Sequence, residues 1–350
     1  MNLYDANHCP VNQFADSECI SLEHGDGAGL TRQLIHQQIR SKFANPILDR
    51  LGDAASLPTV TGPLAMTTDS FVVSPLFFPG GDIGSLAITG TLNDLAVAGA
   101  QPLWVSLALI IEEGLPLREF ERVMESIRQV TQQAGIMIVA GDTKVVPRGV
   151  TDKLFITTTA LGTPLAGLGS DPRSIQPGDR ILVTGSIAQH GMAIMAARDS
   201  LGIQADIRSD CGLLLPAVQA LHAAQIPIRA MRDATRGGVA AVLHEWAAQA
   251  GVTLTIDHGQ VPLNDATRGM CELLGLDPLM VANEGTMVVV VPDGWEAAAL
   301  AALRDVPISR KATVIGQAHP RDIAPVTVIR SLGRDIPLDE PAGAGLPRIC

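Results

Sequence analysis

A stretch of turn-forming residues divides this chain near its middle, Asp171-Pro-Arg-Ser-Ile-Gln-Pro-Gly178. Two prolines and a glycine in so short a stretch favour a linker over a helix or strand. The segments on either side both alternate apolar strands with amphipathic helices. We therefore predict two folded domains, for which 350 residues are ample.

The predicted elements indicate the fold class. Before the linker, we predict strands at 64–68, 136–140 and 154–159, and helices at 31–42 (with Thr31 as N-cap), 85–98 and 117–134. After it, we predict strands at 181–184, 253–256, 287–291 and 312–316, and helices at 191–198, 213–223, 238–250 and 295–303. The strands are too few and too irregularly spaced for a Rossmann unit, so we predict an α+β fold. The expected parts are an N-terminal segment (1–45), a first domain (46–170), a second domain (171–335) and a flexible tail (336–350).

Composition and charge exclude several classes of protein. The net charge is −11 and no run of Lys or Arg offers a stripe for phosphates, which argues against nucleic-acid binding. Five scattered cysteines without a CxxC pair argue against a disulfide framework or a structural zinc site, and fit a reducing cytoplasm. We find no signal peptide and no apolar run near the ~20 residues of a membrane span. We therefore expect a soluble, cytoplasmic protein with no membrane partner.

Polar side chains interrupt apolar segments at several places in the first half. Asp69 follows one predicted strand, Asn93 and Asp94 lie inside an apolar helix, and Asp142 follows another strand with Lys144 close behind. A single carboxylate at a strand end is usually a turn former or a helix cap. Asp94 is different, because a charge within an apolar helix costs desolvation energy unless it is paired or metal-bound. Several converging carboxylates would suit Mg²⁺ with phosphate.

Glycine-rich loops precede two of the predicted helices. Gly25 and Gly27 lie in His24-Gly-Asp-Gly-Ala-Gly29, where backbone N–H groups could approach phosphate, although a flexible hinge explains the glycines equally well. The stretch Arg232-Asp-Ala-Thr-Arg-Gly-Gly238 is either a phosphate loop or a capped turn. Glu284, just before the apolar strand at 287–291, is a candidate general base if a Lys or Arg holds it ionised.

The final segment, from Pro341 to Cys350, is rich in Gly and Pro and shows no helical or strand period. A thiol at the end of such a segment could reach both a loading enzyme and a pocket on its own protein. A frayed end that happens to carry a cysteine is the simpler interpretation of this residue alone.

Together, these segments resemble the HypE family of hydrogenase maturation factors, the carbamoyl dehydratases, within the ATP-binding superfamily of aminoimidazole ribotide synthetase. The resemblance runs from His24 to Cys350. Its motifs are Thr67-Thr-Asp69, Asn93-Asp94, Gly141-Asp-Thr-Lys144, Met231-Arg-Asp-Ala-Thr-Arg-Gly-Gly238, Ala282-Asn-Glu-Gly285 and Pro347-Arg-Ile-Cys350. The last motif is specific to HypE and favours a chemical role for Cys350. Two positions depart from the family pattern: Ala28 replaces a glycine and Ala234 replaces a proline.

The resemblance implies an enzyme that uses ATP to dehydrate a carbamoyl group on the Cys350 thiol. The thiocarbamate becomes a protein thiocyanate, which supplies cyanide ligands for the iron of [NiFe] hydrogenase. The implied partners are the carbamoyltransferase HypF, the HypC–HypD complex as cyanide acceptor, and a second copy of the chain. The dimer is expected to form through strands of the first domain, with contributions from the strand at 64–68 and the segment around 71–78.

The resemblance also implies roles for individual residues. It assigns Asp69, Asp94 and Asp142 to Mg²⁺ binding. ATP is assigned to the same three aspartates together with Asn93, Gly25 and Gly27. The carbamoyl chemistry is assigned to Cys350, Glu284 and Lys144. Two alternatives remain open. One is a small-molecule kinase or synthetase of the same superfamily, such as thiamine monophosphate kinase or selenophosphate synthetase. The other is a non-catalytic scaffold for maturation partners.

Overall fold

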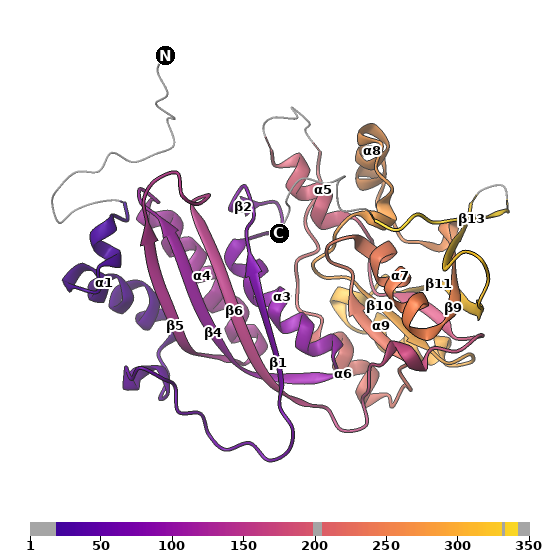
Figure 1. Ribbon diagram of the computed structural model, residues 1–350, viewed down its shortest axis with the longest axis horizontal. Coiled ribbons are helices and arrows are strands. Elements are labelled where there is room, and N and C mark those ends of the chain that lie inside the picture. The colour runs from indigo at the N-terminus through magenta and orange to yellow at the C-terminus, as the bar shows by residue number, and fades with distance from the viewer. Residues whose placement is uncertain (1–18, 199–204, 331–332, 342–350) are drawn as a thin grey trace.

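The computed structural model describes residues 19–198, 205–330 and 333–341, which form two lobes (Figure 1). The strands are β1 (Ala65–Phe71), β2 (Phe77–Phe78), β3 (Gly81–Asp82), β4 (Ala100–Glu112), β5 (Met137–Val146), β6 (Leu154–Pro164), β7 (Arg180–Val183), β8 (Ala230–Asp233), β9 (Val252–Asp257), β10 (Met287–Val291), β11 (Thr313–Pro320), β12 (Val326–Ile329) and β13 (Asp335–Pro337). The α-helices are α1 (Gly29–Leu34), α2 (Ser41–Phe43), α3 (Ile83–Val97), α4 (Leu117–Ala134), α5 (Gln189–Ala196), α6 (Leu215–Ala223), α7 (Gly238–Ala250), α8 (Asp265–Leu274) and α9 (Glu296–Arg304). A π-helix, Ile35–Arg40, joins α1 to α2. Within the described ranges, every helix is too short or too polar to cross a lipid bilayer.

The first lobe is built on a four-stranded sheet in the order β1-β6-β4-β5. β4 and β5 run parallel, whereas β6 is antiparallel to both of its neighbours. The helices α3 and α4 cover one face of this sheet (Figure 1). Burial therefore alternates along β1 and β6, as in a sheet with one face in the core.

Both long helices of the first lobe are present where the sequence predicts them. α4 buries a single stripe of side chains and ends at Gly135 in the left-handed conformation. α3 begins after Asp82, whose carboxylate accepts hydrogen bonds from the backbone N–H groups of Gly84 and Ser85. Nearly all of α3 is buried, because the helix lies between the first sheet and the second lobe.

The longest strand, β4, is absent from the sequence-based prediction. Its apolar run follows α3 almost directly, and it contains Pro102, a residue that usually argues against an interior strand. The pairing of β4 with β6 shifts register between Pro102 and Trp104. The proline is accommodated at this irregularity, so the strand continues through it.

Three of the differences between predicted and observed element ends change the setting of residues singled out from the sequence. β1 continues through Asp69 and β5 continues through Asp142, so both carboxylates lie within strands instead of after them. The first helix has Ala28 as its N-cap, and Thr31 lies inside its first turn. The Thr31 hydroxyl instead accepts a hydrogen bond from the backbone N–H of Gly27, at 2.9 Å.

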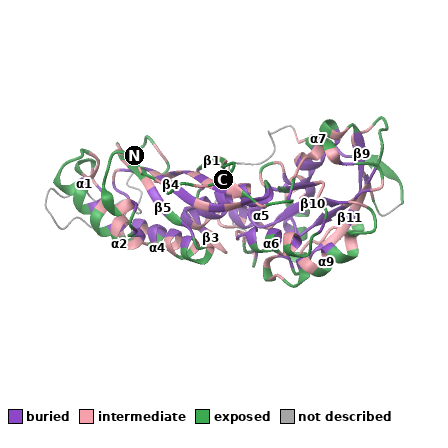
Figure 2. Ribbon diagram, turned by 90° about the horizontal axis from the view of Figure 1, so that it is seen from below, coloured by how far each residue is buried: buried purple, intermediate pink, exposed green. Residues whose placement is uncertain are grey.

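The second lobe contains a seven-stranded sheet in the order β13-β12-β9-β11-β7-β10-β8. Apolar side chains of α6 and α9 pack on one face, and those of α5, α7 and α8 on the other. β10 lies between these layers and is buried along its whole length (Figure 2). Four of these strands were predicted from the sequence, whereas β8, β12 and β13 were not. The predicted α+β class is confirmed, and the predicted linker lies between the end of β6 and the start of β7.

The end of the described chain belongs to the second lobe. β13 pairs with β12, and Leu338 is buried in the apolar core. The predicted start of a flexible tail at residue 336 is therefore too early. Cys350 lies outside the described residues. Cys19 is disulfide-bonded, whereas Cys211 and Cys271 are free.

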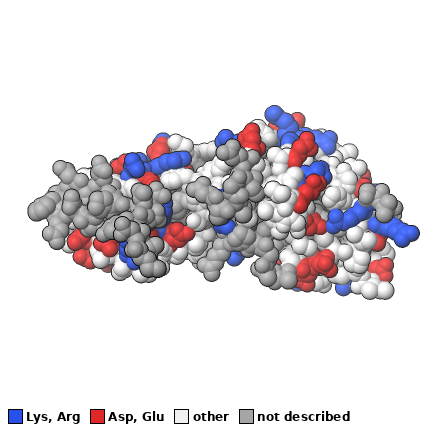
Figure 3. Space-filling model, turned by 90° about the horizontal axis from the view of Figure 1, so that it is seen from above, with Lys and Arg blue, Asp and Glu red and all other residues white. Residues whose placement is uncertain are grey.

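Figure 3 shows the face of the molecule that is seen from above the view of Figure 1. Among the described residues visible there, acidic and basic side chains are interspersed over both lobes, and neither sign forms a continuous stripe.

Candidate functional site

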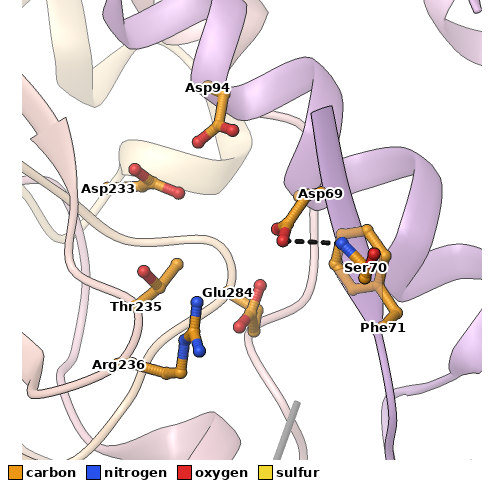
Figure 4. A pocket seen from close by; sticks show the side chains of 9 residues that line it. Asp69, Ser70, Phe71, Asp94, Asp233, Thr235, Arg236 and Glu284 are labelled. Atoms are coloured by element: carbon orange, nitrogen blue, oxygen red, sulfur yellow. Dashed lines mark hydrogen bonds between the residues drawn. The ribbon is translucent and has the colours of Figure 1, made fainter. Parts of the chain in front are cut away.

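A cavity of about 50 Å³ lies where the two lobes meet, and acidic side chains dominate its lining (Figure 4). We call it the carboxylate cavity. Its lining residues are Asp69, Ser70, Phe71, Gly90, Asp94, Asp233, Thr235, Arg236 and Glu284. The first five come from β1 and α3, and the other four from the end of β8, the turn between β8 and α7, and the loop before β10. The cavity therefore exists only because α3 brings the lobes together.

The aspartates of this cavity repel one another and are partly desolvated. The Thr67 hydroxyl donates a hydrogen bond of 2.8 Å to Asp94, but burial still raises the pKa of Asp94, and the charge of Asp69 adds to the effect. Burial, with the charge of Asp94, also raises the pKa of Asp233 to about 7. Such a cluster favours a bound cation or proton.

Glu284 is the most deeply buried carboxylate of the cavity, with 3% exposure. Burial raises its pKa well above the ordinary value, and the charges of Asp233 and Asp210 add to this. Asp210 also fixes the backbone here, because its two carboxylate oxygens accept from the N–H groups of Glu284 and Gly285, each at 3.0 Å. A Cβ at Gly285 would lie 1.8 Å from the carbonyl oxygen of Asp210, so only glycine allows this approach.

Asn93 lies behind the cavity and does not line it. Its Nδ2 donates to the carbonyl oxygens of Gly212 (2.9 Å) and Glu284 (3.3 Å), and its Oδ1 accepts from the backbone N–H of Leu214 (2.8 Å). The amide is 1% exposed. Within this chain, Asn93 therefore clamps the second lobe onto α3 and holds the backbone of Glu284, which differs from the predicted contact with nucleotide.

Asp142 and Lys144 border a different cavity, of about 270 Å³, which we call the N-terminal cavity. Its lining comprises Gly25, Gly27, Thr31, Ile35, Ile39, Leu48, Leu107, Leu109, Ile138, Ala140, Gly141, Asp142, Thr143 and Lys144. The Lys144 ammonium lies 3.0 Å from Asp142, and both side chains are more than 60% exposed, at 63% and 62%. A Cβ at Gly25 would lie 2.9 Å from Val145, so close contact with β5 is sufficient reason for that glycine.

The predicted site residues thus fall into two groups. Asp69, Asp94 and Glu284 share the carboxylate cavity, whereas Gly25, Gly27, Asp142 and Lys144 border the N-terminal cavity. A single chain does not unite the predicted metal set of Asp69, Asp94 and Asp142. Lys144 is likewise not the cation beside Glu284; among the described residues, Arg236 is the cation that lines that cavity (Figure 4).

The fit of the carboxylate cavity to Mg²⁺ can be judged from its donors. Within the described ranges, no three His, Cys, Asp or Glu side chains stand at the spacing of a preformed metal site. Mg²⁺ commonly takes only one or two protein carboxylates and completes its shell with water and substrate phosphates. Asp69 and Asp94, with Asp233 nearby, fit that mode of binding, and they do not fit a closed structural site.

Asp233, Thr235 and Arg236 are absent from the predicted set of site residues. The sequence feature that could have identified them is the stretch 232–238. This stretch had two equally good interpretations, a phosphate loop and a capped turn. In the structure, this stretch leads into α7. The chain turns at Gly237 and Gly238, which have positive φ angles of 80° and 62°. The N-terminus of α7 therefore begins beside the cavity, where a helix favours an anion.

Comparison with known proteins identifies the class of fold and then the family. Residues 52–163 match the family described as AIR synthase related protein, N-terminal domain, and residues 176–328 match its C-terminal domain. The chain is 43% identical over 337 residues to the carbamoyl dehydratase HypE of Escherichia coli strain K12, covering 95% of this chain and 99% of that protein. This protein therefore belongs to the HypE family of carbamoyl dehydratases.

Two solved structures extend the comparison. A hydrogenase maturation protein HypE in complex with ATP superposes with a TM-score of 0.90 at 41% identity, covering 94% of this chain and 99% of that one. The structure of a HypE–HypF complex contains a chain that matches with a TM-score of 0.77 at 38% identity, covering 88% of this chain and 99% of that one.

Proposed function

We propose that this protein is an ATP-dependent carbamoyl dehydratase that converts a thiocarbamate on Cys350 into a thiocyanate for [NiFe] hydrogenase maturation. The observation that carries the proposal is the carboxylate cavity itself. In a chain of the HypE family, it combines a buried glutamate, a cluster of aspartates, an arginine and a helix N-terminus at the junction of the lobes.

The proposed reaction is balanced without water. The thiocarbamate R–S–C(=O)NH₂ and ATP give R–S–C≡N, ADP and phosphate: the amide oxygen bonds to the γ-phosphorus, the bond from that phosphorus to ADP breaks, and the C–O bond breaks as phosphate leaves. The nitrogen loses both protons, one of which goes to the leaving phosphate and the other to a base. Bound ATP supplies the phosphoryl group that makes the oxygen a leaving group.

The residues of the cavity suit these requirements. Asp69 and Asp94 would hold Mg²⁺ with the nucleotide, and Arg236 with the N-terminus of α7 would neutralise phosphate charge. Glu284 is the proposed base for the amide protons. Its raised pKa means that a cation near it, such as Arg236, is needed to keep it ionised.

The proposed partners follow from the relatives. HypF is proposed as the enzyme that loads Cys350, which the solved HypE–HypF complex of a similar chain supports. We propose the HypC–HypD complex as the acceptor of the cyanide group. These roles place the protein in metalloprotein assembly.

We also propose a homodimer that forms through the first sheet. The face of this sheet away from α3 and α4 exposes Met66 (67%) and Ile110 (40%). The predicted contribution of residues 71–78 is wrong in part, because Phe71 and Phe78 are buried within the chain. A dimer could bring the N-terminal cavity of one copy toward the carboxylate cavity of the other, which would reunite the two groups of predicted residues. Met66→Lys should give a monomer in analytical ultracentrifugation; a dimer of unchanged affinity would contradict this interface.

Mass spectrometry of the C-terminal peptide tests the proposed activity. Incubation with carbamoyl phosphate, ATP and HypF should add about 43 Da to Cys350, followed by a loss of about 18 Da, and Cys350→Ala should show neither change. Loading without the loss, at saturating ATP, would favour a scaffold. An adduct on another cysteine would overturn Cys350 as acceptor.

A further inference from the structure

A buried histidine in the second lobe holds the segment that leads to Cys350. His244, on α7, is 7% exposed, and its Nε2 donates a hydrogen bond of 3.0 Å to the backbone carbonyl oxygen of Leu338. The Leu338 side chain is 6% exposed within the apolar core. Its backbone N–H donates to the carbonyl of Val326 at 3.0 Å. Leu338 is therefore fixed by its side chain, its N–H and its carbonyl.

The fixed segment ends beside the carboxylate cavity. After β13 and Leu338, the described chain reaches Pro341, and a Cβ at Gly237 would lie 3.8 Å from the Pro341 ring. Gly237 directly follows Arg236, which lines the cavity. One helix thus makes both contacts, because α7 carries His244 in its middle and has the cavity loop at its N-terminus.

The anchoring point decides how much chain separates the thiol from the cavity. From Pro341, roughly nine residues lead to Cys350, and they can span about 30 Å at most, at ~3.3–3.6 Å per residue. If residues 335–341 left the lobe, the chain between the last fixed residue and Cys350 would begin near β12 and grow to roughly 20 residues. Effective concentration falls at least as the −3/2 power of linker length, so this release would lower it about threefold.

We propose that His244 and Leu338 form a tail anchor, whose function is to deliver the segment bearing Cys350 to the carboxylate cavity. Both are positioning residues that act through the chain and touch no reacting atom. The inference rests on the proposed function for its catalytic consequence, but the anchor itself is a structural property that can be measured separately.

The first measurement is hydrogen exchange at the amide of Leu338 in the full chain. Wild-type protein should protect this amide, His244→Leu should lose the protection, and His244→Gln, which keeps an N–H donor, should retain most of it. His222→Leu is the matched control, because His222 makes the same kind of bond, at 2.9 Å, to the carbonyl of Ala166, away from the tail. An unprotected Leu338 amide in wild-type protein would overturn the anchor.

The second measurement is the single-turnover rate of thiocyanate formation. On pre-carbamoylated full-length protein, His244→Leu should slow the reaction about threefold, whereas His244→Gln and His222→Leu should not. A synthetic C-terminal peptide with an S-carbamoyl cysteine, added to Cys350→Ala protein, should react at the same rate with or without His244→Leu. This difference between the attached and the separate substrate is specific to tethering.

The outcomes separate the two proposals. An equal loss with attached and separate substrates would mean damage to the cavity and would overturn the anchor as a positioning device. An unchanged rate with the attached substrate would do the same. If wild-type protein forms no thiocyanate, the proposed function fails, while protection of Leu338 still decides whether the anchor exists. Leu338→Ala removes the other half of the anchor and should repeat the result if His244→Leu does not fold.

Discussion

The two cavities place similar chemical groups in very different surroundings. The carboxylate cavity holds Glu284, Asp94 and Asp233 where the lobes exclude water, and burial raises the pKa of all three. The N-terminal cavity has Asp142 beside Lys144, but both are largely exposed. An exposed ion pair is screened and contributes little. Both cavities have acidic side chains, but only burial shifts their pKa values. Burial therefore makes the carboxylate cavity the more suitable of the two for proton transfer.

The two cavities also differ in the function that their lining suits, although the sequence assigned their residues to a single site. The carboxylate cavity has groups for phosphate, metal and proton transfer, whereas the N-terminal cavity is larger and has mostly apolar walls. An apolar cavity with a few polar groups at its edge is typical of a binding site.

Replacing the buried base should have the largest effect. Glu284→Gln keeps the shape of the side chain but cannot accept a proton, so single-turnover thiocyanate formation should fall by roughly 10²–10⁴. ATP binding and carbamoylation of Cys350 should remain. Glu112→Gln is a suitable control, because Glu112 is also buried but binds the backbone N–H groups of Gly149 and Lys153. A normal rate in Glu284→Gln would remove it as the base.

The matched pair Asp94→Asn and Asp142→Asn tests whether both cavities serve one nucleotide. Asp94→Asn should abolish Mg–ATP binding in calorimetry, while relief of repulsion leaves stability unchanged or higher by about 0.5–2 kcal/mol. If a dimer unites the cavities, Asp142→Asn should weaken binding too. Mixing the two variants should then restore binding above either parent, because one mixed site is intact. Wild-type affinity in Asp142→Asn would confine the nucleotide to the carboxylate cavity.

Stability of the metal-free protein should fall as pH rises. The folded state holds the proton of Asp233 up to pH about 7, whereas an unfolded aspartate releases it near pH ~3.9, so stability decreases between these values. One pKa unit corresponds to about 1.36 kcal/mol, so a loss of a few kcal/mol is expected. Melting curves at pH 5 and pH 8 should show this fall in the wild type and less of it in Asp233→Asn. An equal pH dependence in the two proteins would contradict the assigned burial.

The smallest effect on stability should come from the exposed pair. Lys144→Gln removes a contact between two side chains that are each more than half exposed, at 63% and 62%. The free energy of unfolding should change by less than about 1 kcal/mol, measured by denaturant titration. A larger loss would mean that the N-terminal cavity is more closed in solution than its exposure indicates.

Site residues could be predicted from the sequence where their immediate sequence neighbours already made them unusual. Asp94 was recognisable because a charge within an apolar helix needs an explanation, and α3 indeed directs it into the carboxylate cavity. Arg236 was missed, because a cationic turn before a helix has two ordinary explanations. The clamping contacts of Asn93 were not recognisable, since its partners are backbone groups that become neighbours only when the lobes dock, and its contact with nucleotide stays a prediction.

Four features could be predicted from the amino-acid sequence: the α+β class, the position of the linker, the helices α3 and α4, and the family. These follow from periodicity, turn residues and motifs, all of which are short-range properties of the chain. The folded structure was needed to show that Glu284 is accompanied by Arg236 and not by Lys144, and that Asp142 belongs to a different cavity from Asp94. It also decided that Leu338 fixes the tail to His244. Such assignments depend on contacts between residues far apart in sequence. Burial exists only after those contacts form, and burial is what shifts the pKa values of these side chains and distinguishes them from solvated charges.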